Sequence, residues 1–347
     1  MPTRFRAGLI GCGFYARNHL NAWRDLGEDV ELVAVCDQDR KKAEAAATAF
    51  GVPRWYTDAA QMLGSEALDF VDIVTTMPSH KALVTLAASH KVPVIVQKPF
   101  APTWQECLDM VEACRAAGIP LMVHENFRFQ SPILDVREFL KAGVIGKPIW
   151  GRITWRTGYD IYAGQPYLAR EERFILLDLG VHVLDLARVL MGEVERVSCE
   201  TQSIKPGIAG EDMATMLLRH VTGAVSIVDC SYATKRDPDP FPETLLEIEG
   251  ERGSLILSPG LELRVTSDGK SDTRSLRTPL LPWTSEPWHV SQESVLNTQR
   301  HWVECLKAGV EPETSGRDNL RTYALVEAAY RSAATHQIVR PDAEASG

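Results

Sequence analysis

Side chains suited to acid–base chemistry lie in two short segments of this sequence. Lys98 stands in the segment Gln97-Lys98-Pro99-Phe100, and Asp178 and His182 stand four residues apart. Residues at that spacing share one face of a helix, so Asp178 is expected to orient the His182 imidazole and leave its other nitrogen as a general base. The Lys98 ammonium would hydrogen-bond the same substrate oxygen and stabilise negative charge that develops there. This pattern indicates removal of a proton from a hydroxyl group.

Each segment also has a simpler interpretation. Lys98 could be a surface lysine in a turn, because most lysines are exposed. Asp178, His182 and the nearby Asp185 could form a satisfied polar network on a buried helix. A metal site is a third interpretation, but the ligand spacings typical of zinc are missing, so we expect no metal. Its candidate ligands would be Asp178, His182, His124 and Glu125.

A glycine-rich turn near the N-terminus fits the pattern G-x-G-x-x-G/A, after a predicted strand and before a predicted helix. The first glycine permits the tight turn, the second lets a pyrophosphate approach the backbone, and the final alanine keeps helix and strand close. The predicted helix would present its N-terminus to the phosphates. The cofactor-binding residues of this turn are Gly11, Gly13, Phe14, Tyr15 and Ala16.

Asp37 ends the second predicted strand, 21 residues after Ala16. A carboxylate at this position would accept hydrogen bonds from the adenine ribose and repel a 2′-phosphate. Asp37 could instead cap a helix before Arg40, and Arg40 and Lys41 lie close enough to soften the cofactor preference. The turn and Asp37 together predict a dinucleotide site that favours NAD over NADP.

The elements that must position these residues alternate over the first third of the chain. Apolar runs at residues 6–10, 31–36, 54–56, 70–75, 92–96 and 120–123 predict strands, and most of the segments between them show helical spacing. This alternation predicts a doubly wound parallel sheet of the Rossmann type, whose ligands bind at the carboxyl ends of the strands. Lys98 and Asn126 would both stand at that edge.

The pattern changes after Asn126. One helix and a strand over residues 149–156 lead to the helix that carries His182, and several strands with hairpin-like gaps follow. We therefore expect an α/β protein with a NAD-binding domain over residues 1–126. Residues 127–347 would form an α+β domain with a large, open, mostly antiparallel sheet, which binds substrate and supports oligomerisation.

The strand over residues 149–156 is expected to end near the substrate. Arg152, Thr154 and Arg156 alternate onto one face, and Trp155 points to the other. Arginine binds a carboxylate in a bidentate manner, so Arg156 and the hinge residue Arg128 favour a hydroxylated acid as substrate. These arginines could equally be exposed or internally paired, and Trp155 or Tyr159 could stack on a neutral sugar. Trp283 and Trp288, in or beside a proline-rich loop, are further candidates for substrate contact.

Composition excludes several classes of partner. The net charge is −9 and the sequence pI is about 5.6, which argues against binding to nucleic acid or to an anionic membrane. No apolar run approaches the length of about 20 residues that a membrane helix needs. The seven cysteines are scattered without a C-x-x-C pair, which is typical of a reducing cytoplasmic compartment.

A second copy of the chain is the expected macromolecular partner. An antiparallel sheet covered by helices on one face leaves its other face to be buried. Residues that could supply this apolar face are Val225, Ile227, Leu246 and Ile248. We expect a homodimer or a homotetramer.

With these motifs in order, the chain resembles the glucose-fructose oxidoreductase/inositol dehydrogenase (Gfo/Idh/MocA) family from about Phe5 to Thr335. The matching features are the glycine-rich turn, Asp37, a T-x-P-type turn, an E-K-P-like motif and D-x-G-x-H-x-x-D over residues 178–185. The resemblance implies oxidation or reduction at a carbinol of a sugar, polyol or sugar acid. It implies Lys98, Asp178 and His182 as the catalytic group. It also implies further cofactor contacts from Thr75, Thr76, Pro78, His80, Gln97, Lys98 and Asn126.

One departure from the family pattern concerns Gln97, which replaces the usual glutamate. A neutral amide can still hydrogen-bond but cannot pair with charge, so the surroundings of Lys98 differ from those in the family. Within the family the chain is similar to D-apionate oxidoisomerases, which implies a sugar acid as substrate and an isomerisation after oxidation. A non-catalytic NAD(H)-binding sensor, a dehydrogenase of neutral polyols, and a hydrolase or lyase that oxidises only transiently are the alternatives.

Overall fold

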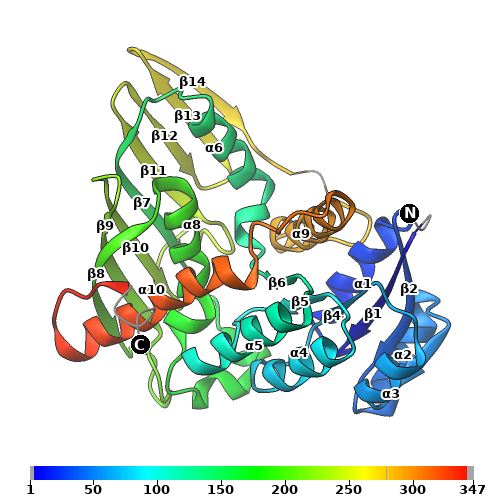
Figure 1. The fold of residues 1–347 in the computed structure, drawn as a ribbon. Coiled ribbons are helices and arrows are strands. Elements are labelled where there is room, and N and C mark those ends of the chain that lie inside the picture. The colour runs from blue at the N-terminus through cyan, green and yellow to red at the C-terminus, as the bar shows by residue number, and fades with distance from the viewer. Residues whose placement is uncertain (1–3, 279, 342–347) are drawn as a thin grey trace. The chain divides into compact units, whose positions relative to one another are not determined.

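The computed structural model describes residues 4–278 and 280–341 (Figure 1). The chain divides into two compact units. Unit 1 contains residues 1–126 and 292–320, and unit 2 contains residues 127–291 and 321–347. The sequence-based division placed residues 292–320 in the second domain. The structure assigns them to unit 1, so unit 1 is assembled from two separate stretches of chain.

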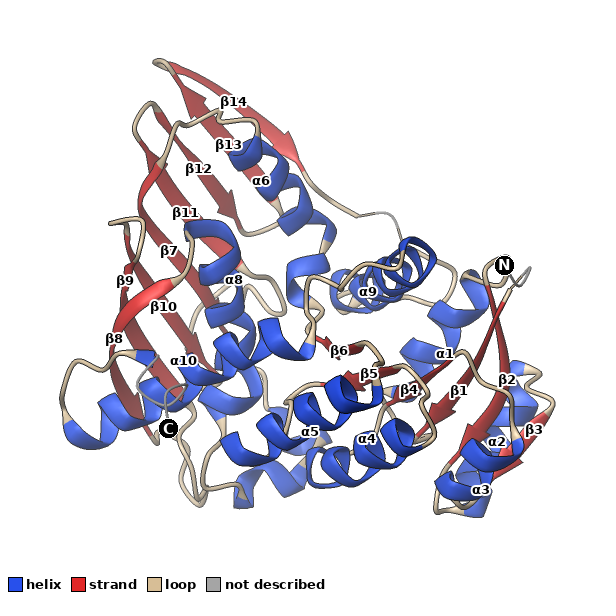
Figure 2. Cartoon of the chain, viewed as in Figure 1, coloured by secondary structure: helices blue, strands red, loops and turns tan. Residues whose placement is uncertain are grey.

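Unit 1 holds a six-stranded, wholly parallel sheet in the order β3-β2-β1-β4-β5-β6 (Figure 2). The strand order reverses between β1 and β4, which is the switch point where ligands of such sheets bind. The predicted Rossmann sheet is confirmed. The strands are β1 Phe5–Ile10, β2 Val30–Cys36, β3 Arg54–Tyr56, β4 Phe70–Ile73, β5 Val94–Gln97 and β6 Leu121–His124.

The helices of unit 1 begin and end at residues that the sequence marks. Asp39 caps α2 by accepting from the Lys41 N–H at 2.9 Å, and Gly51 ends that helix in the left-handed region. Sequence periodicity missed α3, because it has only seven residues. The helices that follow strands are α1 Ala16–Asp25, α2 Arg40–Phe50, α3 Ala59–Ser65, α4 His80–Ser89 (after the short η1, Met77–Ser79) and α5 Trp104–Ala117.

Helix α9 (His289–Ala308) completes the core of unit 1. Trp302 is fully buried, and its ring centroid lies 6.0 Å from that of Phe70 on β4. The Phe70 ring lies in turn 5.1 Å from Trp23 on α1. Helix α10 (Gly316–Thr335) begins in unit 1 and continues in unit 2.

Unit 2 holds an eight-stranded sheet in the order β14-β13-β12-β11-β7-β10-β9-β8. Only the pair β7·β10 is parallel, so the predicted mostly antiparallel sheet is confirmed. Strands β13 and β14 were not predicted from the sequence, since every residue of β14 is exposed and no apolar alternation marks it. The strands are β7 Pro148–Arg156, β8 Val194–Gln202, β9 Met213–His220, β10 Val225–Ser231, β11 Leu245–Gly250, β12 Gly253–Ser258, β13 Glu262–Ser267 and β14 Lys270–Ser275.

Helices cover one face of this sheet. Helix α8 (Val181–Met191) lies against β7, where Gly151 leaves room for it: a Cβ on Gly151 would stand only 3.1 Å from the Met191 sulfur. The remaining helical segments of unit 2 are η2 Phe127–Phe129, α6 Ser131–Lys141, α7 Ile161–Gly164, η3 Pro166–Arg170 and η4 Leu176–Gly180.

The opposite face of the sheet is more open. Leu217 lies there and is 52% exposed, opposite the half-buried Ile227. Leu246 and Ile248, which we expected on this open face, are instead fully buried on the helix-covered face. The strand alternation was right, but the sequence could not tell which of the two faces the helices cover.

Cysteines and membrane segments were two further points of the sequence analysis. All seven cysteines are free, and six of them are buried. Burial raises the pKa of the Cys36, Cys114 and Cys199 thiols to about 12, so these groups stay protonated. Within residues 4–278 and 280–341, no helix combines the length and apolar character needed to cross a membrane.

Trp302 provides a test of the two-part core of unit 1. Replacing Trp302 by alanine should lower the free energy of unfolding by about 3–5 kcal/mol, because a fully buried indole leaves a large cavity. Chemical denaturation of the full chain measures this loss. Trp288→Ala is the matched control, since Trp288 is 37% exposed and its replacement should cost much less stability. Equal losses would contradict the placement of α9 in this core.

Candidate active site

The glycine-rich turn between β1 and α1 has the geometry of a phosphate-binding turn. Gly11 has φ +98°, and a Cβ there would stand 2.5 Å from the Val74 carbonyl oxygen, so only glycine fits. A Cβ on Gly13 would meet no heavy atom within 4 Å, so a ligand can approach the backbone of Gly13 closely. Phe14 is 93% exposed, and Tyr15 precedes α1 without a side-chain cap. The first N–H groups of α1 are therefore suited to an anion.

Asp37 ties this turn to the end of β2. Its Oδ2 accepts from the Cys12 N–H at 2.8 Å and its Oδ1 accepts from the Asp39 N–H at 2.8 Å. The cap of α2 is Asp39, so the alternative of Asp37 as helix cap is wrong. Arg40 lies over the Trp55 ring and pairs with Glu44 at 3.5 Å. The Asp37 carboxylate keeps further lone pairs that can accept from ribose hydroxyls, so the glycine-rich turn and Asp37 fit NAD.

His80 links the two turns that follow β4 and β5. Its Nδ1 lies 3.1 Å from the Phe100 carbonyl oxygen and its Nε2 lies 3.1 Å from the Thr75 carbonyl oxygen. The ring is fully buried, so His80 holds the turns in place, and the proposed direct cofactor contact does not fit its position. Ser79 strengthens the first turn by donating to the Thr75 hydroxyl at 2.7 Å. Thr76 and Pro78 stand in the same turn, just after β4.

The turn after β5 carries Lys98, and the Lys98–Pro99 peptide is cis. The Gln97 side chain folds back on this turn and accepts from the Lys98 N–H at 2.7 Å. Its amide nitrogen lies 3.0 Å from His19 Nε2 on α1. Asn126, another predicted cofactor contact, donates to the Ser294 hydroxyl of α9 at 2.7 Å and is buried.

His182 stands in the first turn of α8, and its ring is stacked on Phe127. The centroids are 3.8 Å apart and the planes differ by 6°. Asp178 lies in η4, a π-helical turn, so the segment between the two residues is not the uninterrupted α-helix that their spacing predicted. π-turns are rare and occur frequently at functional sites. Sequence spacing gave no sign of this turn or of the role of Phe127.

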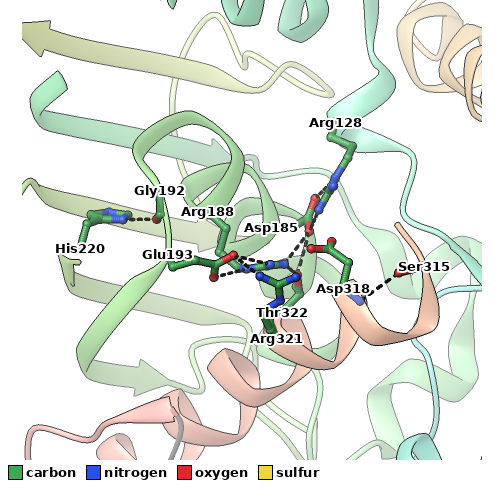
Figure 3. A network of polar contacts seen from close by, with 10 residues as sticks. All are labelled: Arg128, Asp185, Arg188, Gly192, Glu193, His220, Ser315, Asp318, Arg321 and Thr322. Atoms are coloured by element: carbon green, nitrogen blue, oxygen red, sulfur yellow. Dashed lines mark hydrogen bonds and ion pairs between the residues drawn. The ribbon is translucent and has the colours of Figure 1, made fainter. Parts of the chain in front are cut away.

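Asp185, three residues after His182 on α8, belongs to a buried network (Figure 3). Its carboxylate accepts from Arg128 Nε at 2.8 Å and Nη2 at 2.5 Å, and from the Thr322 hydroxyl at 2.8 Å. Burial alone would raise the pKa of Asp185, but Arg128, Arg188 and Thr322 hold it below its usual value. Arg188 continues the network to Glu193 through two hydrogen bonds of 3.0 and 2.8 Å.

This network changes the interpretation of Arg128. Two of its guanidinium nitrogens bind Asp185, and the residue is only 4% exposed. Arg128 therefore fixes η2, and with it Phe127, against α8. The proposed contact between Arg128 and a substrate carboxylate does not fit this position.

Arg156 lies on the sheet face opposite α8. Its Nη1 donates to Asp229 Oδ1 at 3.1 Å, and Arg152 binds the other oxygen of the same carboxylate. Ile153 and Trp155 point to the helix-covered face instead, and the Trp155 indole donates to the Pro242 carbonyl at 3.0 Å. The alternation of β7 was predicted, but the structure places Arg156 away from His182.

Three aromatic rings form a cluster beside the end of β7. Tyr159 and Phe241 are stacked at 4.3 Å, and Trp288 meets both edge-on at 5.5 and 4.7 Å. Asp239 holds the loop of Phe241 by accepting from the Thr157 hydroxyl at 2.8 Å and the Gly158 N–H at 2.6 Å. Tyr159 and Trp288 are each 37% exposed, so both residues remain accessible to a ligand.

A cavity of about 280 Å³ adjoins this cluster and shares Phe241 with it. Its polar lining includes Glu243, Arg277 and His289. Burial raises the pKa of the Glu243 carboxyl, which accepts from the Gly260 N–H at 2.8 Å. The structure contains no group of three or more His, Cys, Asp or Glu side chains able to hold a metal ion within the part of the chain it describes.

Two family models match the chain. A model described as "Oxidoreductase family, NAD-binding Rossmann fold" matches residues 5–125, and one described as "GFO/IDH/MocA C-terminal domain" matches residues 133–256. The first match covers the glycine-rich turn, Asp37 and Lys98. The second covers Asp178 and His182.

Curated relatives match nearly the whole chain. D-apiose dehydrogenase from Paraburkholderia graminis is 53% identical over 95% of this chain and 88% of its own length. D-apiose dehydrogenase from Rhizobium rhizogenes is 50% identical over 97% of both chains. Myo-inositol 2-dehydrogenase from Thermotoga maritima is 27% identical over 94% of this chain and 96% of its own.

A solved structure is similarly close. The crystal structure of an oxidoreductase from Agrobacterium radiobacter in complex with NAD+, L-tartaric acid and magnesium is 50% identical. It superposes with a TM-score of 0.96 and covers 99% of this chain and 100% of its own.

The Arg128–Asp185 pair can be tested by a double-mutant cycle. Arg128→Met should lower the free energy of unfolding by about 3–5 kcal/mol, because it leaves a buried carboxylate uncompensated. Arg128→Met combined with Asp185→Asn should cost less than the sum of the single changes. The matched control is Arg115→Met, which breaks an exposed pair with Glu112 and should cost at most about 1 kcal/mol. Additive losses at Arg128 and Asp185 would contradict the pairing.

His80 predicts a pH dependence of stability. Burial holds the pKa of His80 below its usual value, so the unfolded chain takes up a proton more readily than the native state. The contribution of neutral His80 to the free energy of unfolding is therefore fully present above the ordinary histidine pKa of about 6.5. It is lost progressively as the pH falls below that value. His80→Asn should lose less stability than wild type between pH 7.5 and pH 5.5 in denaturant titrations. The exposed His90→Asn serves as control, and a wild-type pH dependence in His80→Asn would contradict the assignment.

Proposed function

The chain belongs to the Gfo/Idh/MocA family of NAD-binding oxidoreductases, and from this membership we propose that it oxidises a carbinol of a small neutral sugar, with D-apiose as first candidate. The enzyme class is an NAD-dependent dehydrogenase that acts on CH–OH groups. Two relatives at least 50% identical over nearly their whole length are named D-apiose dehydrogenases, which supports this substrate.

The observation that carries the proposal is the arrangement within unit 2. His182 is held by stacking on Phe127, and the partly exposed residues Tyr159 and Trp288 are suited to contact the apolar face of a sugar ring. Arg128 and Arg156, which favoured an acidic substrate, are each bound to a carboxylate of the protein. The proposed substrate is therefore neutral.

The proposed reaction uses three side chains of the chain. His182 removes the hydroxyl proton as general base, and Asp178 keeps its imidazole in the required orientation and tautomer. Lys98 donates a hydrogen bond to the same oxygen and stabilises the negative charge that develops on it. Bound NAD supplies the acceptor for the hydride that leaves the carbinol carbon.

A sugar acid is the second candidate. The similar Agrobacterium radiobacter structure was determined with L-tartaric acid, a hydroxylated acid. In this chain Arg277 lines the cavity beside Phe241 and is exposed, so it could meet a carboxylate. An isomerisation after oxidation, as in D-apionate oxidoisomerases, would still form one NADH for each substrate consumed. It would be recognised by a rearranged carbon skeleton in a product that has lost two hydrogens.

A substrate panel tests the proposal. NADH formation is measured with D-apiose, D-apionate, L-tartrate and myo-inositol, and D-apiose should give the highest kcat/KM. His182→Asn should lower kcat by about 10²- to 10⁴-fold, the usual contribution of a general base. His90→Asn, an exposed change, should leave kcat unaltered. Turnover of the acids alone would overturn the neutral-sugar proposal, and full activity of His182→Asn would overturn the assignment of the base.

A further inference from the structure

We propose that Gln97, His19 and Asp72 form a hydrogen-bonded positioning network that holds the Lys98 turn. In this network the protonation state of each side chain is fixed by its hydrogen-bond partners. The neutral Gln97 amide requires a neutral His19 imidazole, and this makes the geometry of the turn independent of pH in the neutral range. The inference rests on the proposed function, because that function makes Lys98 the group that contacts substrate.

The orientation of the Gln97 amide follows from its two contacts. The Lys98 N–H is a donor, so the Gln97 atom 2.7 Å away must be the acceptor oxygen. The other end of the amide is then the NH₂ group, which lies 3.0 Å from His19 Nε2. An NH₂ group can only donate to a ring nitrogen that carries no proton. His19 Nε2 is therefore the acceptor.

The opposite side of the His19 ring fixes its tautomer. His19 Nδ1 lies 2.8 Å from Asp72 Oδ2, so Nδ1 carries the proton and donates it to the carboxylate. The same oxygen accepts from the Trp23 indole at 2.8 Å, with the Gln299 amide 3.4 Å away. His19 with one proton on Nδ1 and none on Nε2 is a neutral imidazole.

The network lies out of reach of solvent. His19 and Asp72 are fully buried, and Gln97 is 7% exposed. The titratable rings that face His19 are His124 on β6, at 4.3 Å, and Tyr15 before α1, at 5.6 Å. No cation among the described residues forms an ion pair with Asp72; its negative charge is held by neutral N–H donors. A second negative charge in this place would be costly.

This explains what glutamine achieves at position 97. A glutamate could still accept from the Lys98 N–H, but it could not donate to His19 Nε2. An additional proton would then have to reside on His19 or on the glutamate itself. The turn would keep its geometry only while that proton is bound, so activity would fall as the pH rises. Glutamine supplies the missing hydrogen without any titration.

The first test reads the network directly and needs no substrate. In the full chain labelled with ¹⁵N-histidine, the His19 imidazole should show one protonated and one bare nitrogen from pH 6 to pH 9, unchanged. In Gln97→Glu, the extra proton should appear on His19 or on the introduced carboxylate and be lost within that range. His19→Gln and His19→Asn assign the resonances. An imidazolium at His19 in the wild-type chain would overturn the proposal.

The second test follows kcat with the best sugar against pH. The kcat of Gln97→Glu divided by that of wild type should fall by at least about tenfold between pH 6 and pH 9. The reason is that the fraction of enzyme that carries the required proton falls about tenfold for each pH unit above its pKa. Gln97→Met cannot titrate, so its ratio to wild type should be low and flat. Gln61→Glu on the exposed face of α3 is the matched charge control and should match wild type.

The two tests separate the possible failures. A purely structural role of Gln97 predicts parallel pH profiles for Gln97→Glu, Gln97→Met and wild type, and that result would overturn the positioning network. If no sugar is turned over, the proposed function fails, while the ¹⁵N measurement still decides whether His19 is neutral. If Gln97→Glu does not fold, two measurements still test the network. A neutral His19 in the wild-type chain together with a low, pH-independent kcat ratio for Gln97→Met supports it, and an imidazolium at His19 overturns it.

Discussion

A buried amide and a buried imidazole must satisfy each other's hydrogen bonds, and this requirement shapes the turn that carries Lys98. Gln97 binds the Lys98 N–H from one side, and His80 lies against the Phe100 carbonyl two residues further along. Because the His80 ring also lies against the Thr75 carbonyl, the turns after β4 and β5 are linked. Lys98 therefore stands on a segment whose backbone is held by the side chains of Gln97 and His80.

The two units stabilise buried carboxylates in different ways. Asp72 in unit 1 is held by neutral N–H donors from His19 and Trp23, which leaves the network with a net negative charge. Asp185 in unit 2 is bound by Arg128, with Arg188 nearby, so its charge is compensated. The first arrangement depends on a defined tautomer, and the second depends on ion pairs. Substitutions in them should therefore have different consequences for pH dependence and for stability.

Much of the fold could be predicted from the sequence, because the signals are local. The glycine-rich turn, Asp37 at the end of β2 and the alternating pattern of unit 1 each lie within a few tens of residues. The positions of Lys98 after β5 and His182 on α8 followed from the same patterns. The resemblance to a family then gave the enzyme class.

The features that the sequence did not reveal depend on contacts between distant residues. His19 and Gln97 are separated by 78 residues, and no local pattern joins them. The π-turn at Asp178 replaces a continuous α-helix without any proline or glycine signal before Gly180. Arg156 alternates correctly along β7, but only the packing of α8 decides which face is covered. Trp302 joins unit 1 although it follows the whole sheet of unit 2 in the chain.

The most direct test of the central claim is the mass balance of one turnover. The enzyme is incubated with NAD+ and D-apiose, and the sugar product is analysed by mass spectrometry together with the NADH formed. A dehydrogenase of the proposed kind gives a product that has lost two hydrogens, with one equivalent of NADH for each sugar consumed. An unchanged sugar, or a product of unchanged mass formed without NADH, would contradict the account.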